Sequence, residues 1–329
     1  MFGSAAVDYI SLDPTRRQTL RMMSAGLMGV GLAGCADLIP QGLGLKLLPN
    51  PLTDPAVFNF ALNLEYLEAE YYNRGLHGVG LSPELVGPNP GPVLGGRQVA
   101  FRSPWLRELF AEIAADETAH VRFIRRTISS SPLVEINRPA LDLQNSFRLL
   151  GQQAGLGENF DPFSDEESFL LGSFIFEDVG VTAYAGGSDL IADDESIEAA
   201  AGILATEAYH AGAIRATIAE MGERMVRAAD GISRARAAAE SPDNRRPNRT
   251  SVLTTLGKEQ PISAGHEFPG EVVIAPTDPQ GRTWPRPPQD VLNIVYMNPD
   301  PDARRGGFFP QGVQGIVRHA MNANASRSS

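Results

Sequence analysis

The pattern that decides the fold occurs twice, as Glu117-Thr118-Ala119-His120 and as Glu207-Ala208-Tyr209-His210. Each copy lies inside a longer segment whose apolar residues recur with helical spacing. On a helix, residues three apart lie on the same face about one turn apart. Each copy therefore directs one carboxylate and one imidazole the same way, and two copies facing each other would form a cluster of oxygen and nitrogen ligands.

The composition is that of a globular protein: of 329 residues, 43% are hydrophobic and 20% charged. The net charge of −11 argues against nucleic acid as a partner, because binding to phosphates needs a basic surface. The chain has one cysteine, which excludes intrachain disulfides and cysteine-based metal sites.

The first 34 residues have the features of a targeting segment. Arg16-Arg17 precede an apolar run from Met22 to Gly34, and this run is shorter than the roughly 20 residues that span a bilayer. The arginine pair resembles a twin-arginine export signal. Residues 1–34 are therefore predicted to be a signal peptide, and the protein to be exported.

A lipid anchor is predicted at the end of this run. Leu32-Ala33-Gly34-Cys35 resembles a bacterial lipoprotein cleavage box, so Cys35 would be lipidated and residues 35–53 would form a tether. This places the protein in the periplasm or on a membrane of a bacterium. The alternative is a buried apolar helix that contains a cysteine by chance.

An all-α fold with four long helices is predicted for residues 54–230. A long crossover between the second and third helices, over Ser131–Asp161 with a short helix at Leu141–Leu150, would keep both helix pairs antiparallel. The helices are expected over Asp54–Gly75, from Pro104 to Ser129, from a capping box at Ser164–Glu167 to Gly186-Gly187, and from Asp193 or Asp194 to about Asp230-Gly231, with a short Arg/Ala-rich helix after it.

Two further glutamates lie on core faces of the first and third helices. Glu65 and Glu177 interrupt apolar stripes, and each is followed seven residues later by a tyrosine, Tyr72 and Tyr184. A carboxylate on a core face is costly unless it is paired or bound to a metal. In the first helix Glu68 flanks the stripe and is the alternative to Glu65 as a ligand.

Six side chains thus form one candidate site. Four carboxylates and two imidazoles suit two divalent ions, and hard oxygen donors with imidazole favour iron or manganese. The predicted metal ligands are Glu65, Glu117, His120, Glu177, Glu207 and His210.

The pattern resembles the ferritin-like di-metal carboxylate superfamily over Asp54 to about Asp230. The resemblance implies that the six residues are ligands of a two-ion centre. It also implies that Tyr72 and Tyr184 hydrogen-bond a ligand carboxylate across the bundle or supply an electron. The resemblance further implies that Asp116 orients a ligating histidine, His210.

The C-terminal extension, residues 231–329, is rich in Pro, Gly and Arg and is expected to pack on the bundle. It is predicted to hold a short strand at Glu271–Ile274 and a helix at Asp290–Met297. With Arg305–Gly312, this helix resembles the desiccation-related ferritin-like family. The isolated histidines His77, His266 and His319 are interpreted as structural or surface residues.

Two classes of function remain open from the sequence. The first is a di-iron or di-manganese oxidoreductase that reacts with dioxygen, peroxide or ferrous iron in stress protection. The second is a non-catalytic stress or envelope protein with a structural or vestigial metal site. Iron storage fits less well, because long loops and a tail do not suit a cage subunit. A homo-oligomer or an envelope partner is expected.

Overall fold

The computed structural model describes residues 53–129, 137–240, 259–265, 269–315 and 317. The predicted signal peptide, Cys35 and the tether up to residue 52 lie outside these ranges, as do His266 and His319. Within the described ranges, no helix combines the length and apolar character needed to cross a bilayer.

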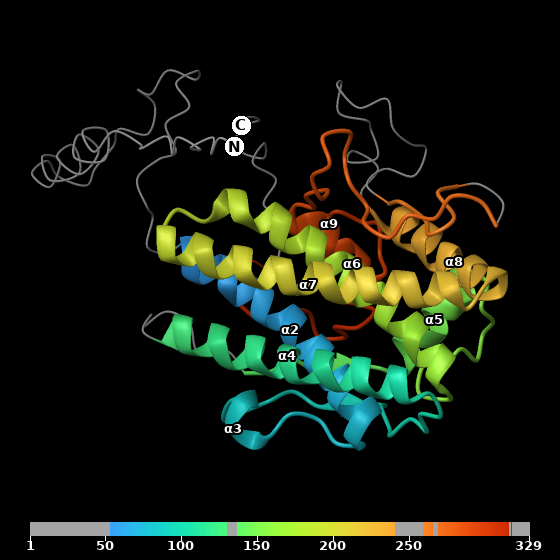
Figure 1. Cartoon of the computed structure of the whole chain (residues 1–329). Helices are drawn as coiled ribbons and strands as arrows, with labels where there is room; N and C mark the ends of the chain where they lie inside the picture. Colours follow the sequence, from blue (N-terminus) through green and yellow to red (C-terminus); the bar gives the residue numbers. More distant parts are fainter. Residues whose placement is uncertain (1–52, 130–136, 241–258, 266–268, 316, 318–329) are drawn as a thin grey trace, which may run out of the picture. The chain divides into compact units, whose positions relative to one another are not determined.

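Four long helices form a bundle, which confirms the predicted all-α fold. They are α2 (Thr53–His77), α4 (Pro104–Ser129), α6 (Glu166–Gly187) and α7 (Asp194–Glu220). α2 packs along α4 and α6 packs along α7, and the two helices of each pair run in opposite directions (Figure 1). Residues at helical spacing line the interior, where Leu106, Phe110 and Ile113 of α4 are fully buried.

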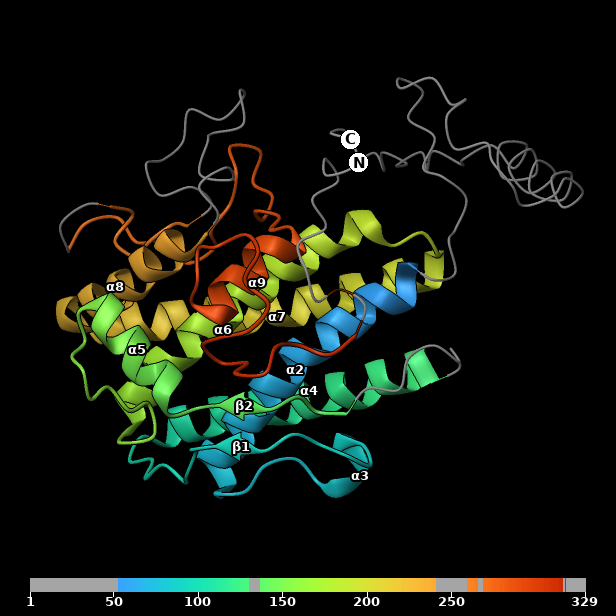
Figure 2. The ribbon, with the colours of Figure 1, turned by 180° about the vertical axis from the view of Figure 1, so that it is seen from behind.

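The two connections that flank α4 lie side by side. The first contains α3 (Pro83–Val86) and β1 (Val93–Leu94), and the crossover contains β2 (Leu141–Asp142) and α5 (Asn145–Ala154). β1 and β2 pair in parallel, with Val93 opposite Leu141 (Figure 2).

The start of the crossover helix was predicted too early. Leu141 and Asp142 are paired in the sheet, and the Asp142 carboxylate accepts the backbone N–H groups of Gln144 and Asn145. These two hydrogen bonds fold the chain into a turn just before a helix that begins at Asn145. The apolar pattern from Leu141 therefore spans the end of a strand and the first turns of a helix.

Aspartates cap the third and fourth helices. Asp165 accepts the N–H of Ser168, and Asp193 accepts the N–H of Ser196. The capping box predicted at Ser164–Glu167 is therefore wrong in detail, since Asp165 is the capping residue. The Glu166 carboxylate accepts the N–H groups of Arg102 and Ser103 instead, which joins α6 to the start of α4.

The fourth bundle helix ends earlier than the sequence indicated. It stops at Glu220, because Gly222 has φ +91° and breaks the helical path before α8 (Glu223–Ala239). The predicted end at Asp230-Gly231 lies inside α8. A Cβ on Gly231 would stand 2.2 Å from the Ala154 carbonyl oxygen, so this glycine allows α8 to approach α5.

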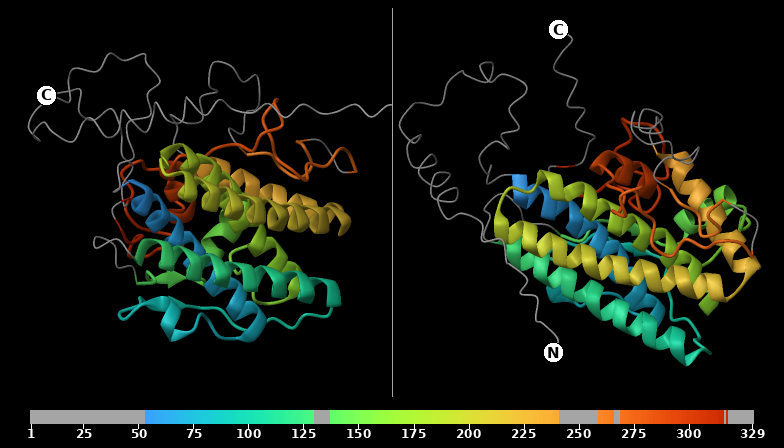
Figure 3. Two further views of the ribbon diagram at one scale, coloured as in Figure 1. Left: turned by 60° about the vertical axis from the view of Figure 1, so that its left-hand side comes forward. Right: turned by 45° about the horizontal axis from the view of Figure 1, so that its top comes forward.

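The described part of the C-terminal extension covers α6 and α8. α9 (Pro288–Tyr296) contacts both helices on the side of the bundle away from α4 (Figure 3). Phe308 packs on Phe147 and Phe176, with ring centroids 5.1 Å apart in each pair. The strand predicted at Glu271–Ile274 is wrong, because this segment has no partner strand among the described residues.

Buried ion pairs join this extension to the bundle. Arg215, Arg236 and Arg286 are fully buried and bind carboxylates from three different segments. These carboxylates are Asp178 of α6, Glu240 after α8, and Glu259 of the extension. Removing one partner of such a network leaves an uncompensated buried charge, so the network fixes how the extension lies.

Candidate metal centre

The bundle brings all six predicted ligands together in its interior. Glu65 comes from α2, Glu117 and His120 from α4, Glu177 from α6, and Glu207 and His210 from α7. All four carboxylates are fully buried, and both imidazoles are nearly so. Each helix contributes these side chains from its buried face, so the cluster occupies positions that core residues would fill.

The six side chains form two adjoining groups of donor atoms. In the first, His120 Nδ1 lies 3.2 Å from Glu65 Oε2, 3.4 Å from Glu117 Oε2 and 3.7 Å from Glu207 Oε1. In the second, His210 Nδ1 lies 3.2 Å from Glu117 Oε1 and 3.3 Å from Glu177 Oε2. The donor atoms of each group lie within 4.8 Å of one another, as a single ion requires.

Glu117 belongs to both groups. Its Oε2 faces His120 and its Oε1 faces His210, so one carboxylate can serve two ions at once. This arrangement follows from its position between the two imidazoles on neighbouring helices.

Several of these donor atoms have no hydrogen-bond partner among the described residues. Both oxygens of Glu117 and of Glu207, one oxygen of Glu177, and Nδ1 of His210 are buried without a hydrogen-bond partner. Buried polar atoms are normally satisfied, and a group of orphaned acceptors around one point calls for cations. The donor set therefore fits two metal ions with a preference for oxygen and imidazole ligands.

Two tyrosines fix ligand carboxylates from across the bundle. The Tyr72 hydroxyl on α2 donates to Glu177 Oε1 on α6 at 2.5 Å, and the Tyr184 hydroxyl on α6 donates to Glu65 Oε1 on α2. Burial and the neighbouring glutamate charges raise the pKa of both phenols well above the usual value. Both tyrosines therefore stay protonated and keep donating.

Asp116 orients one of the two histidines. Its Oδ2 lies 3.1 Å from Nε2 of His210, which leaves Nδ1 facing the carboxylates. Its side chain is 40% exposed, so this residue connects the buried cluster to the surface. The equivalent position on α7 is Thr206, whose hydroxyl donates to Gly202 on its own helix. The support around the centre is thus asymmetric.

The carboxylates and imidazoles of the cluster change one another's pKa values. Burial lowers the pKa of each histidine, but the carboxylates outweigh it: Glu65 and Glu117 raise the pKa of His120 to about 12, and Glu177 and Glu117 raise that of His210 to about 12. Burial and the charge of Glu65 raise the pKa of Glu117 to about 7. Metal ions would replace protons as the positive charge that these carboxylates need.

The two glutamates left open on the first helix have different surroundings. Glu65 is one of the donors around His120. Burial raises its pKa, but the charge of His120 and hydrogen bonds to its carboxylate outweigh burial, so the pKa lies below the usual value. Glu68 is also buried, and burial together with the charges of Glu117 and Glu177 raises its pKa well above the usual value. Glu65 thus occupies the predicted ligand position. Glu70 is buried away from the cluster, where Arg74 and Arg138 bind it.

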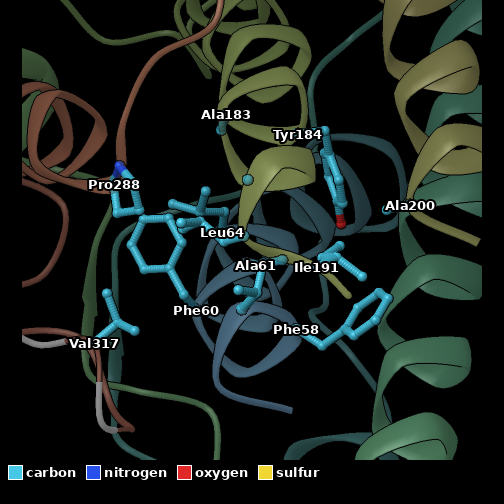
Figure 4. Close-up of a pocket in the computed structure, with 13 residues that line it drawn as sticks. Phe58, Phe60, Ala61, Leu64, Ala183, Tyr184, Ile191, Ala200, Pro288 and Val317 are labelled. Atoms are coloured by element: carbon cyan, nitrogen blue, oxygen red, sulfur yellow. The ribbon is translucent and has the colours of Figure 1, made fainter. Parts of the chain in front are cut away.

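An apolar pocket lies at the end of the bundle where α2 begins and α6 ends. Tyr184 forms one wall of this pocket, and its hydroxyl binds Glu65 (Figure 4). Pro288 and Val317 of the C-terminal extension close another side, beside the start of α2. His77 lies elsewhere, exposed at the end of α2, as predicted.

Two structural features of the site were not anticipated from the sequence. The first is Gly180 on α6, which has no side chain where Glu207 approaches. The second is Asp178, the neighbour of Glu177, which binds the arginines Arg215 and Arg236. A glycine within a long apolar helix was the available signal for the first, since it costs helix stability unless space is needed.

A buried carboxylate–histidine cluster inside a four-helix bundle with a long second connection defines a ferritin-like protein. The sequence model of the ferritin-like domain matches residues 53–220. The desiccation-related protein PCC13-62 of Craterostigma plantagineum is 30% identical over 277 residues, which cover 80% of this chain and 84% of the relative. The chain therefore belongs to the desiccation-related ferritin-like family.

A second relative carries a functional name. The ferritin-like catalase Nec2 of Nesocodon mauritianus is 27% identical over 271 residues, which cover 80% of this chain and 84% of the relative. No solved structure matches the chain significantly.

Proposed function

We propose that this protein is an exported di-metal enzyme that decomposes hydrogen peroxide. Two peroxide molecules would yield one dioxygen and two waters, one peroxide losing the two electrons that the other gains. The observation that carries the proposal is the pair of donor groups that share Glu117. The similarity to a protein named a ferritin-like catalase supports this reaction over other uses of the same site.

Two ions of iron or manganese, when bound, would supply the reversible exchange of two electrons. Glu65, Glu117, His120 and Glu207 would hold one ion, and Glu117, Glu177 and His210 the other. The protein's own contribution is to fix these side chains: Tyr72 and Tyr184 hold Glu177 and Glu65 by hydrogen bonds. We infer that both tyrosines act as positioning residues.

The surroundings of the site suit a small, uncharged substrate. The carboxylates are buried and the pocket beside Tyr184 is lined by apolar side chains, so a charged molecule would lose its hydration on the way in. Hydrogen peroxide and dioxygen are uncharged and small. Burial would also keep bulk water and larger reductants from the ions.

The test uses the full mature chain loaded with Mn²⁺ or Fe²⁺. We expect about two ions per chain by elemental analysis, as the two donor groups predict, and dioxygen release from peroxide at one O₂ per two H₂O₂. The double variant Glu117→Ala/His210→Ala should lose both the metal and the activity. Metal-free protein with an intact bundle, or full activity in this variant, would contradict the proposal and favour a non-catalytic stress protein.

Measuring ferrous-iron oxidation alongside separates the two oxidative alternatives. Rapid oxidation of Fe²⁺ by dioxygen, without dioxygen release from peroxide, would overturn the peroxide reaction and leave a ferroxidase. The similarity to a protein named desiccation-related supports a role in stress protection in either case.

Export and anchoring are part of the same proposal. Arg16-Arg17 and the apolar run that ends at Cys35 support export of the folded, metal-loaded chain and lipidation of the cysteine. We expect Arg16→Lys/Arg17→Lys to retain the protein in the cytoplasm of the producing cell. Cys35→Ser should release it from the membrane fraction, and unchanged fractionation of both variants would exclude this localisation.

A further inference from the structure

Glu68 is a buried carboxylate that the six-ligand site leaves unexplained. It lies on α2 one turn beyond Glu65, is 5% exposed, and forms no hydrogen bond or ion pair with any residue of the described ranges. An isolated buried carboxylate is costly, so a partner is expected.

Buried carboxylates elsewhere in the described ranges have their partners in the protein. Glu70 on the same helix binds Arg74 and Arg138. Others bind arginines or accept backbone N–H groups; they are Asp54, Asp142, Asp178, Asp230, Glu240 and Glu259. Glu68 differs from these residues in lacking both kinds of partner.

The space around Glu68 has an apolar side and an acidic side. On the apolar side a small cavity is lined by Leu67, Phe176 and Phe308, among others. On the other side lies Gly180: a Cβ there would stand 3.5 Å from Glu68 Oε1 and 2.2 Å from Glu207 Oε2. Both carboxylates therefore approach the same glycine at the edge of the metal centre, and neither accepts a hydrogen bond from a group of the described residues.

Gly180 is also the counterpart of Glu68 in the repeated pattern of the bundle. Glu65 and Glu177 occupy equivalent places, each seven residues before its tyrosine, and Glu68 and Gly180 each follow three residues later. The third helix thus lacks a side chain where the first helix carries a carboxylate. This asymmetry leaves room for one additional acidic side chain.

We propose that Glu68 is a seventh metal-binding side chain, which binds the centre together with Glu207 in the space left by Gly180. A metal ion is the partner that this position offers, because the neighbouring groups within reach are carboxylates. The inference rests on the metal centre proposed above and adds to it a residue outside the six predicted ligands.

The additional carboxylate changes the charge of the centre. Five carboxylates carry five negative charges, whereas two divalent ions carry four positive charges and two trivalent ions carry six. With Glu68 ionised, the five negative charges of the protein exceed the charge of two divalent ions by one and fall short of that of two trivalent ions by one. Glu68 therefore stabilises the oxidised centre relative to the reduced one, as fixed negative charge does in a buried site.

Glu68→Gln tests the inference, because it keeps the shape of the side chain and removes the charge. Mn²⁺ affinity is measured by chelator competition and metal content by elemental analysis, with Glu70→Gln as the matched control on the same helix. We expect Glu68→Gln to bind Mn²⁺ about 10- to 100-fold more weakly, a typical cost for disturbing a metal site. Glu70→Gln should lower stability to urea and leave the affinity per folded chain unchanged.

Two further measurements make the result decisive. In chelator, Glu68→Gln should unfold at a higher urea concentration than wild type, because repulsion among buried acids is relieved. Its oxidised centre should be reduced more readily than that of the wild type. Wild-type affinity in Glu68→Gln would refute the role of Glu68 while leaving the metal centre intact, whereas absence of metal from the wild type would refute both.

Discussion

Replacing Gly180 by alanine places a methyl group against the carboxylate of Glu207, and this change separates folding from metal binding. The added Cβ would lie 2.2 Å from Glu207 Oε2, a distance that no real contact tolerates. The clashing atom is the end of a flexible side chain, so Glu207 can rotate away while the backbone of α6 stays in place. The cost therefore falls on the position of the carboxylate oxygen.

The stability of the fold should change little. Alanine within a helix is about 0.5–1 kcal/mol more favourable than glycine. Crowding in a packed interior costs about 1–3 kcal/mol, and the lower end applies where the neighbour can move. The two effects nearly cancel, so the free energy of unfolding in chelator should remain within about 1 kcal/mol of the wild type.

Metal binding should be affected much more. Moving a ligand oxygen out of place weakens metal affinity by about 10- to 100-fold, which corresponds to about 1.4–2.7 kcal/mol. Mn²⁺ affinity is measured by chelator competition and stability by urea unfolding in chelator. Gly202→Ala on α7 is the matched control, because a Cβ there meets no atom within 4 Å. That variant should gain helix stability and keep its metal affinity.

A Gly180→Ala protein that binds Mn²⁺ as tightly as the wild type would refute the reasoning. It would mean that the carboxylate of Glu207 is not required at its present position. A protein that fails to fold would also contradict the expectation, since it would show that Glu207 cannot move independently of the backbone.

Three other changes test separate parts of the structure. Tyr72→Phe removes the hydroxyl that holds Glu177, so metal affinity measured by chelator competition should fall about 10-fold while the fold is retained. An unchanged affinity would contradict the positioning role of Tyr72. Asp116→Asn should weaken metal binding about 10- to 100-fold by loosening the His210 ring, and a wild-type value would show that the hydrogen bond is dispensable. Arg286→Met leaves the buried Glu240 without its arginine and Glu259 with Arg236 alone. It should cost about 3–5 kcal/mol of unfolding free energy in urea, whereas a neutral result would show that the extension is held by apolar packing.

Local patterns in the sequence predicted the bundle and the composition of the cluster. Apolar residues at helical spacing placed the four helices, and polar residues on the same faces marked the ligand candidates. These features are local, because helix periodicity determines which side chains share a face. The repeated seven-residue spacing between Glu65 and Tyr72, and between Glu177 and Tyr184, indicated that the two halves of the bundle correspond.

Backbone conformation, side-chain hydrogen bonds at helix ends and the pairing of strands decided the rest. The end of α7 depends on the backbone of Gly222, and the start of α5 on the Asp142 carboxylate, neither of which alters the apolar pattern. The segment Glu271–Ile274 has the residues of a strand, but a strand needs a partner that the described fold does not provide.

The sequence alone determined which residue types line the interior of the bundle, since that follows from the helical repeat. Only the tertiary structure decided how the donors divide into two groups around Glu117, and that Glu68 and Glu207 both approach Gly180. The physical reason is that metal-site geometry depends on distances between side chains of different helices. Such distances follow from how the helices pack, and no single helix carries that information.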